Sequence, residues 1–359
     1  MNSKERLAAF CRLGNLLKIV IPPENRCISD NIIVPSHEEQ KALDELQLAV
    51  SASIHHNPWF TPTGIYQAIE GLNVLLETVI LSNWANFYNI PDKAQSKRVG
   101  VVMAGNIPAV GFHDFLCVLI SGNIFVGKLS GADMFLIPAI AQLLVAIDGR
   151  FSPYIFFTTE RLSGFDYVIA TGSTNTSRYF NYYFGKYPNI IRSNRNSIAV
   201  LSGNETTEEL QLLATDVFSY FGLGCRNVSL LFVPGGYNFE KMLEIFTHNP
   251  ELINHSKYFN NYEYNKAILL INAISHYDNG TVLLKEDESI SSSVSVLHYK
   301  FYNNVDEVNQ WIDSNGERIQ CVVSGSKKVC HSIPYGQSQT PIVSDYADGV
   351  DTMKFLLSL

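Results

Sequence analysis

From Arg98 onward, short strand-like runs alternate with helical runs, and this alternation limits the folds open to the chain. Buried strands are predicted at RVGVVMA, NIFVGKL, YIFFTT and FDYVIAT, and helices at PAVGFHDFLCVLI, ADMFLIPAIAQLLVAI and SRYFNYYFG. Consecutive parallel strands need a crossover connection, so the pattern predicts a mostly parallel, doubly wound α/β sheet. Sheets of this kind bind ligands at the carboxyl ends of their strands.

A chain of 359 residues is long enough for two domains with a cleft between them. The first ~95 residues show helical spacing of apolar positions, and a second alternating set of strands and helices follows residue 203. We therefore expect N-terminal helices and one α/β domain over residues 1–203 and a second α/β domain over residues 204–335. The tail, residues 336–359, is expected either to serve self-association or to pack back on the first domain.

The net charge of −8 argues against a protein that binds the phosphate backbone of nucleic acids. No apolar run reaches the ~20 residues that a bilayer requires, and the first residues show no signal-peptide pattern. These features predict a soluble, cytoplasmic protein without a membrane span. The six cysteines form no CxxC pairs and no clusters with histidine, so neither a zinc site nor any other metal site is predicted.

One cysteine has an unusual context. Cys225 lies in YFGLGCRN between a predicted helix and a predicted strand. Thr206 and Glu209 begin the helix as a capping box, and its apolar positions run to Phe221, where Gly222 ends it. A small buried thiol is the ordinary interpretation. However, Gly222 and Gly224 permit a backbone that a ligand can approach closely, and a thiolate is a strong nucleophile. We therefore predict that Cys225 is a nucleophile.

A second candidate is Asn106, in the sequence MAGNIPAVGFHDF after a predicted strand. An asparagine here can simply satisfy the backbone of a turn. Pro108 is predicted to open the following helix, and a side-chain amide at a helix start can donate to a developing oxyanion.

Two further strand ends carry candidates for nucleotide binding. Lys128 ends the strand NIFVGKL and is either a solvated lysine or a ligand for ribose hydroxyls or phosphate. Gly172 and Ser173 lie between a strand and a helix start, where backbone N–H groups favour phosphate. The glycines of GLGCRN do not form a dinucleotide fingerprint, because Asn227 replaces the third glycine and a strand follows instead of preceding it.

Taken in order, these stretches resemble the aldehyde dehydrogenase superfamily, and specifically its acyl-CoA reductase branch, which includes the fatty-acid reductases of bacterial luminescence. The resemblance rests on GNIPAVGFHDFLCVLISGN, VGKLS, TGST, YFGLGCRNVSLLFVP, NRNSIAVLSGNE and YGQSQTPIVSDYADGVDTMKFL, and it runs from about residue 95 to the end. It implies a dinucleotide-binding first domain and a catalytic second domain. It also implies Cys225 as the acyl-accepting nucleophile, Asn106 as the oxyanion donor, and Lys128, Gly172 and Ser173 as ligands of a nicotinamide dinucleotide.

Of two acidic residues in the superfamily pattern, one is replaced in this sequence and the other stands in an altered context. The glutamate that activates water reads as Arg192 in IIRSNRNSIAV. The acid that binds the nicotinamide ribose corresponds to Glu288, although the expected Phe-Gly-Pro is missing. Without an activated water, an acyl-enzyme is hydrolysed slowly, so the departure at Arg192 favours a reductase.

The resulting hypothesis is reduction of a long-chain acyl-CoA to the fatty aldehyde through a thioester on Cys225. NADPH is favoured over NADH because no acidic residue occurs within Leu129–Ala132 to repel a 2′-phosphate. The alternatives are an NAD(P)-dependent aldehyde dehydrogenase, a cysteine peptidase that uses a downstream histidine, and a non-catalytic nucleotide-binding subunit. An acyl-CoA or acyl-carrier substrate, an acyl-activating partner enzyme and self-association into a homo-oligomer are the partners implied by the resemblance.

Overall fold

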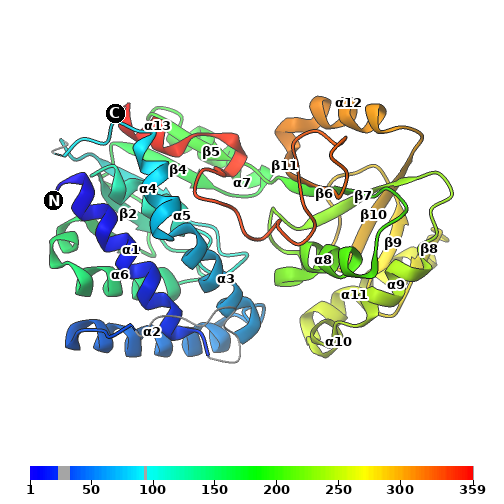
Figure 1. The fold of residues 1–359 in the computed structure, drawn as a ribbon, viewed down its shortest axis with the longest axis horizontal. Coiled ribbons are helices and arrows are strands. Elements are labelled where there is room, and N and C mark those ends of the chain that lie inside the picture. Colours follow the sequence, from blue (N-terminus) through cyan, green and yellow to red (C-terminus); the bar gives the residue numbers. More distant parts are fainter. Residues whose placement is uncertain (23–32, 93–94, 359) are drawn as a thin grey trace. The chain divides into compact units, whose positions relative to one another are not determined.

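The computed structural model describes residues 1–22, 33–92 and 95–358, and the chain divides into two compact units (Figure 1). The first unit comprises residues 1–193 and 341–359, and the second comprises residues 194–340. Each unit contains one largely parallel sheet. The predicted fold class, with two α/β units and an N-terminal helical region, is therefore confirmed.

The sheet of the first unit has the strand order β3-β2-β1-β4-β5, and all its pairs are parallel. Its strands are β1 (Arg98–Val102), β2 (Ile124–Lys128), β3 (Ile155–Thr158), β4 (Tyr167–Thr171) and β5 (Asn189–Arg192). The chain winds outward from β1 in one direction through β2 and β3, and in the other through β4 and β5. The point where the winding reverses lies between β1 and β4, and ligands of such sheets bind at this switch point.

Helices cover both faces of this sheet. One large core joins α1 (Ser3–Val20), α2 (His37–His56), α3 (Pro62–Leu75), α4 (Thr78–Asn86), α5 (Phe112–Ile120), α6 (Leu136–Ile147) and the C-terminal α13 (Thr352–Leu357). A smaller core lies between β4 and α7 (Thr174–Phe184), where Phe180 packs against the strand residues. The 3-10 turns η2 (Gly149–Tyr154) and η5 (Ala347–Gly349) complete the unit.

The second unit has seven strands in the order β12-β11-β6-β7-β10-β9-β8, and only β8 pairs antiparallel. They are β6 (Asn196–Val200), β7 (Val228–Pro234), β8 (His276–Asp278), β9 (Leu283–Glu286), β10 (Val296–Tyr302), β11 (Ile319–Val323) and β12 (Ser332–Ile333). Its helices are α8 (Thr207–Phe218), α9 (Glu240–Thr247), α10 (Pro250–Asn254), α11 (Ser256–Ile271) and α12 (Val305–Asn315), with the 3-10 turns η3 (Ser219–Gly222) and η4 (Gly316–Arg318). Figure 1 shows α12 on one side of the sheet and α8, α9 and α11 on the other.

The capping box predicted at Thr206 and Glu209 is present at the start of α8. Two local expectations differ from the structure. Pro108 does not open a helix, because residues 108–111 form a turn and α5 begins at Phe112. The helix predicted to run to Phe221 ends at Phe218, because Tyr220 and Phe221 have positive φ. The C-terminal MKFLLSL contributes to helix α13, which packs in the core of the first unit.

The division between the units lies after Ser193, ahead of the boundary expected at residue 203. β6 belongs to the second sheet because it pairs with β7 and β11. Within the described residues no single helix has the length and hydropathy of a membrane span. The pair α3 and α4 reaches them together by length and composition, with a bend of 53° at its break.

Candidate active site

Cys225 lies between η3 and β7, ahead of the amino end of a buried strand in the second unit. Cys225 is exposed, whereas Cys11 and Cys321 are partly buried and Cys117 is buried. Burial raises the pKa of the Cys117 thiol well above its ordinary value, which makes that thiol a poor nucleophile. Cys27 lies outside the described residues. Of the described cysteines, only Cys225 combines exposure with a glycine-bounded turn.

The turn before Cys225 has an uncommon backbone. Tyr220, Phe221 and Gly222 have consecutive φ angles of 51°, 59° and 76°, in the left-handed region. Glycine adopts this region freely, but Tyr and Phe do not, so the turn is strained. The ring of Phe221 packs on His255, with ring centroids 4.2 Å apart. Packing of this kind holds the strained residues in place.

A second set of contacts joins the Cys225 segment to residues 336–338 of the same unit. The carboxylate of Asp216, which is fully buried, accepts hydrogen bonds from the amides of Gly336 (2.6 Å) and Ser338 (2.9 Å). Burial raises the pKa of Asp216. The Arg226 side chain donates to the carbonyl of Ser338. These bonds bind the tail of the second unit to both sides of the nucleophile turn.

Asn106 is exposed in the loop that follows β1 in the first unit. The loop turns sharply at Ala109, whose φ is 54°. The amide of Ala109 donates to Oδ2 of Asp133 at 2.8 Å. Gly105 allows the loop to lie against the segment after β2, because a Cβ atom there would stand 2.4 Å from Oγ of Ser130.

Asp133 is a candidate that the sequence analysis did not identify. Its side chain is buried, and its Oδ1 atom has no hydrogen-bond partner among the described residues. Burial raises the pKa of Asp133 to about 6, although the amides of Ala109 and Leu136 oppose the shift. The only sequence signal was its position five residues after Lys128, at the start of a predicted helix, and that signal indicates an ordinary helix cap.

Lys128, Gly172 and Ser173 lie at strand ends beside the Asn106 loop. Lys128 pairs with Val102 at the end of β1, and its Nζ atom donates to the carbonyl of Thr159 at 3.2 Å. Ser173 caps α7, and its side chain accepts from the amide of Thr176 at 3.2 Å. Since β2, β1 and β4 are neighbours, the structure brings the predicted residues of the first unit to one edge of its sheet, at the switch point.

These residues suit a nicotinamide dinucleotide. A helix N-terminus offers backbone N–H groups and a positive dipole end for phosphate, and a lysine can donate to hydroxyl groups. A larger residue at position 172 would be crowded, because a Cβ atom there would lie 2.9 Å from side-chain atoms of both Phe180 and Thr176.

Glu288, predicted to bind the nicotinamide ribose, is exposed and forms an ion pair with Lys300 at 2.6 Å. Lys300 pairs with Phe232 in the middle of β7. Cys225 comes before β7 begins. Glu288 therefore lies farther along the second sheet than Cys225, and no contact that joins the two residues is found among the described side chains.

Arg192 stands where the resemblance expects a water-activating glutamate. Its guanidinium binds both carboxylate oxygens of Asp114, at 2.6 and 2.9 Å, and Oγ1 of Thr352 at 2.8 Å. Burial lowers the pKa of Arg192, but the charge of Asp114 more than offsets this effect. The pair joins β5, α5 and α13. The side chain at this position is thus a cation held by a structural ion pair.

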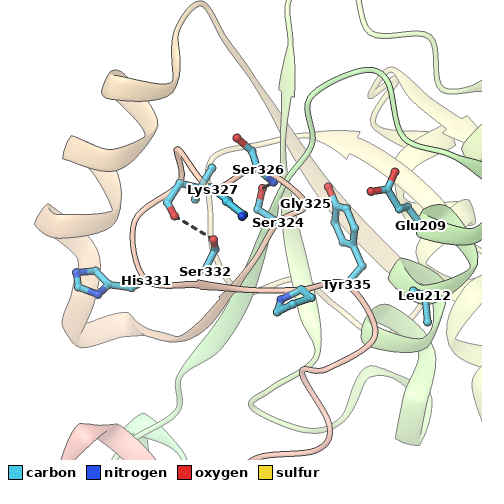
Figure 2. Close-up of a pocket in the computed structure, with 11 residues that line it drawn as sticks. Glu209, Leu212, Ser324, Gly325, Ser326, Lys327, His331, Ser332 and Tyr335 are labelled. Atoms are coloured by element: carbon cyan, nitrogen blue, oxygen red, sulfur yellow. Dashed lines mark hydrogen bonds between the residues drawn. The ribbon is translucent and has the colours of Figure 1, made fainter.

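Two of the cavities that the described residues form lie in the second unit, and Cys225 lines neither of these two. The larger, of about 590 Å³, is formed by residues after β11 and by Tyr335, with Glu209 and Leu212 of α8 on the opposite side (Figure 2). The smaller, of about 420 Å³, lies between the loops after β6 and β7. Both are at carboxyl ends of strands, whereas Cys225 precedes a strand. They do not form part of the Cys225 site.

No protein-family model matches the sequence, and no curated protein matches it. Solved structures are similar to the chain over most of its length. Aldehyde dehydrogenase 21 from Physcomitrella patens, in complex with the reaction product succinate, has a TM-score of 0.68 at 13% identity, over 100% of this chain and 84% of that chain. The fold is that of the aldehyde dehydrogenases.

Two further structures with this fold were determined with NAD+. Mycobacterium tuberculosis aldehyde dehydrogenase has a TM-score of 0.62 at 13% identity, over 93% of this chain and 77% of that chain. The P. syringae indole-3-acetaldehyde dehydrogenase has a TM-score of 0.61 at 14% identity, over 92% and 74%. At such identities the likeness establishes the aldehyde dehydrogenase fold alone.

Proposed function

We propose that the protein reduces an acyl-CoA thioester to an aldehyde with NADPH, through a thioester on Cys225. The observation that carries the proposal is the exposed Cys225 on a strained, glycine-bounded turn in a chain with the aldehyde dehydrogenase fold. Strained backbone persists where a structure over-determines it, and such places are concentrated at active sites.

In the proposed reaction, the Cys225 thiolate attacks the acyl carbon, and the carbon–sulfur bond to CoA breaks. CoA leaves as its thiolate and takes up a proton. Lys128, Gly172 and Ser173 would hold a nicotinamide dinucleotide, which would supply the hydride that reduces the acyl carbon. The Cys225–carbon bond then breaks, which releases the aldehyde and regenerates the thiolate. The role of Asn106 is to donate its amide to the oxygen that becomes negative in both steps.

The buried ion pair of Arg192 supports reduction over hydrolysis. A guanidinium bound to the Asp114 carboxylate carries no lone pair that can accept a proton from water. Hydride and CoA thiolate need no such base. The preference for NADPH is supported by Asp133, the first acid after Lys128, because its carboxyl group is buried against Ala109.

Aldehyde oxidation is the second candidate, favoured by the likeness to aldehyde dehydrogenases. The two reactions differ in product. Given a long-chain aldehyde, NADP+ and CoA, a thioester-forming enzyme yields acyl-CoA, whereas a hydrolytic dehydrogenase yields the free acid. Free acid as the main product would favour the second candidate.

The direct test is intact-protein mass spectrometry after mixing with palmitoyl-CoA in the absence of cofactor. We expect one palmitoyl group on the wild type and on Cys330→Ala, a matched control because Cys330 is also exposed. Cys225→Ala should carry none and should lose NADPH oxidation altogether. If no acyl group is bound across several acyl-CoA chain lengths, the proposal is wrong.

A further inference from the structure

The side chain of Asn227 lies beneath the turn that precedes Cys225, and it is 1% exposed. Its amide nitrogen donates to three carbonyl oxygens, those of Asp216 (3.2 Å), Val217 (3.3 Å) and Ser219 (2.8 Å). Its amide oxygen accepts from the backbone amide of Gly224 at 2.8 Å. One side chain thus joins the end of a helix to the residue directly before Cys225.

Each of these groups needs a partner from outside the helix. The carbonyls of Asp216 and Val217 belong to the last turn of α8, where no later helical amide can reach them. The carbonyl of Ser219 directly precedes the left-handed residues, which begin at Tyr220. Buried carbonyls and amides are nearly always paired, because an unpaired one loses the hydrogen bonds that water would provide. Asn227 supplies a donor for the three carbonyls and an acceptor for the amide of Gly224.

The side chain that does this must be neutral and must both donate and accept. Aspartate would place a carboxylate against three carbonyl oxygens. Alanine would remove the hydrogen bonds that Asn227 makes to these three carbonyls and to the amide of Gly224. The strained residues Tyr220 and Phe221 lie within the segment that Asn227 spans. Conformations of this kind are retained only when surrounding contacts fix them.

We propose that Asn227 is a positioning residue, which holds the turn at residues 219–224 in its strained form and thereby presents the Cys225 thiol. The inference rests on the proposed function for the role of Cys225 in catalysis. Without the amide, the turn relaxes toward backbone angles that Tyr and Phe prefer, and the thiol is presented in only a fraction of molecules. The apparent reactivity falls with that fraction.

The test compares the reaction rates of Cys225 and Cys330 with 4,4′-dithiodipyridine in the full-length chain, with each site resolved by peptide mass spectrometry. Cys330 is an exposed thiol of the same unit and serves as the internal reference. In Asn227→Ala we expect the Cys225:Cys330 rate ratio to fall at least threefold. Asn227→Asp keeps the acceptor for Gly224 but sets a carboxylate oxygen against the three carbonyl oxygens, so its ratio should fall at least threefold as well.

Asn265→Ala is the matched control, because its amide also donates to a backbone carbonyl of the second unit, that of Val294 at 2.9 Å. Its ratio should equal that of the wild type. Turnover of acyl-CoA gives the second readout, with kcat at least tenfold lower in Asn227→Ala and KM within twofold of the wild-type value. Circular dichroism verifies the fold of each variant, and Asn227→Asp carries the test if Asn227→Ala does not fold.

The two proposals fail in different ways. A wild-type protein that reduces no acyl thioester overturns the proposed function, while the thiol ratio remains measurable. A ratio within twofold of the wild-type value in folded Asn227 variants overturns the positioning role.

Discussion

The Asn106 loop of the first unit and the Cys225 turn of the second are both sharply bent, but they are held by different chemistry. The first turns at Ala109 and is held by carboxylates: Asp133 accepts from Ala109, and Asp114 binds Arg192 at the start of the following helix. The second is held from below by the neutral amide of Asn227, and the buried carboxylate of Asp216 binds residues 336–338 beside it and not the turn itself.

This difference separates two ways of fixing a functional loop. A neutral amide donates and accepts at once, so Asn227 satisfies its surroundings without a buried charge. A buried carboxylate only accepts, and Oδ1 of Asp133 is left without a partner among the described residues. The stability of a loop held by a charged side chain therefore depends on the charge partner and on pH, whereas that of a loop held by a neutral amide does not. The predictions below test this contrast.

Loss of a charge partner should have the largest effect. Asp114→Ala leaves the buried guanidinium of Arg192 without its carboxylate, and removing one member of such a pair lowers the free energy of unfolding by about 3 to 5 kcal/mol. Urea unfolding measures this in a Trp311→Phe background, where Trp59 and Trp84 report on the first unit.

Glu38→Ala is the matched control, since Glu38 is an exposed acid in the first turn of a helix of the same unit, and its loss should stay below about 1 kcal/mol. The double variant Asp114→Leu with Arg192→Met should recover most of the lost stability, because it removes both charges. If Asp114→Ala and Glu38→Ala are equally stable, the ion pair does not anchor the loop.

The second prediction concerns pH. The pKa of Asp133 is raised to about 6, so the folded protein binds this proton more tightly than the unfolded chain does. The associated stability is fully present below the ordinary carboxyl pKa of about 4 and is lost as pH rises to about 6, by about 3 kcal/mol in all. Asp133→Asn removes the titrating group but keeps an acceptor for Ala109.

The free energy of unfolding of the first unit should therefore change less between pH 4 and pH 7 in Asp133→Asn than in the wild type. The control is Asp166→Asn, which changes an exposed carboxylate that accepts from the amide of Arg98. Asn227→Asp should introduce a new pH dependence in the second unit, since it replaces the amide anchor by a charged one. If the free energy of unfolding of Asp133→Asn depends on pH as that of the wild type does, the charge of Asp133 does not explain how this loop is held.

The sequence predicts the fold, but it does not predict which side chains hold the two loops. The alternation after Arg98 predicts a parallel sheet because apolar periodicity and crossover geometry are local properties. The same reasoning correctly places Lys128 and Gly172 at strand ends. It failed at Pro108 and Phe221, where tertiary contacts with Asp133 and His255 outweigh the local helical preference.

Sequence patterns do not predict the side chains that hold the two loops, because the partners of these side chains lie in other segments of the sequence. Asn227 was considered only as the residue that breaks a glycine fingerprint, yet its partners include carbonyls in a helix that ends before the turn. Asp114 was given no role, because its partner Arg192 lies on a separate strand. A single sequence holds no signal for such pairings, since both members are ordinary residues in their own segments.

The smallest effect is expected at Gly222, whose φ of 76° is one that glycine adopts without strain. Gly222→Ala meets no steric clash, since the nearest atom to an added Cβ is 3.6 Å away, so its cost is the left-handed conformation, about 1 kcal/mol. Gly235→Ala is the control, because no atom lies within 4 Å of its Cβ position and its φ is not positive.

The same substitution sharpens the comparison when it is combined with Asn227→Ala. If the amide holds the turn in its left-handed form, the turn relaxes without it, and alanine at position 222 then costs less than it does in the wild type. Trp311 fluorescence during urea unfolding, in a background with Trp59 and Trp84 replaced by Phe, gives both free energies for the second unit. Strictly additive losses would mean that the turn keeps its strained form without Asn227, because the rest of the unit enforces it.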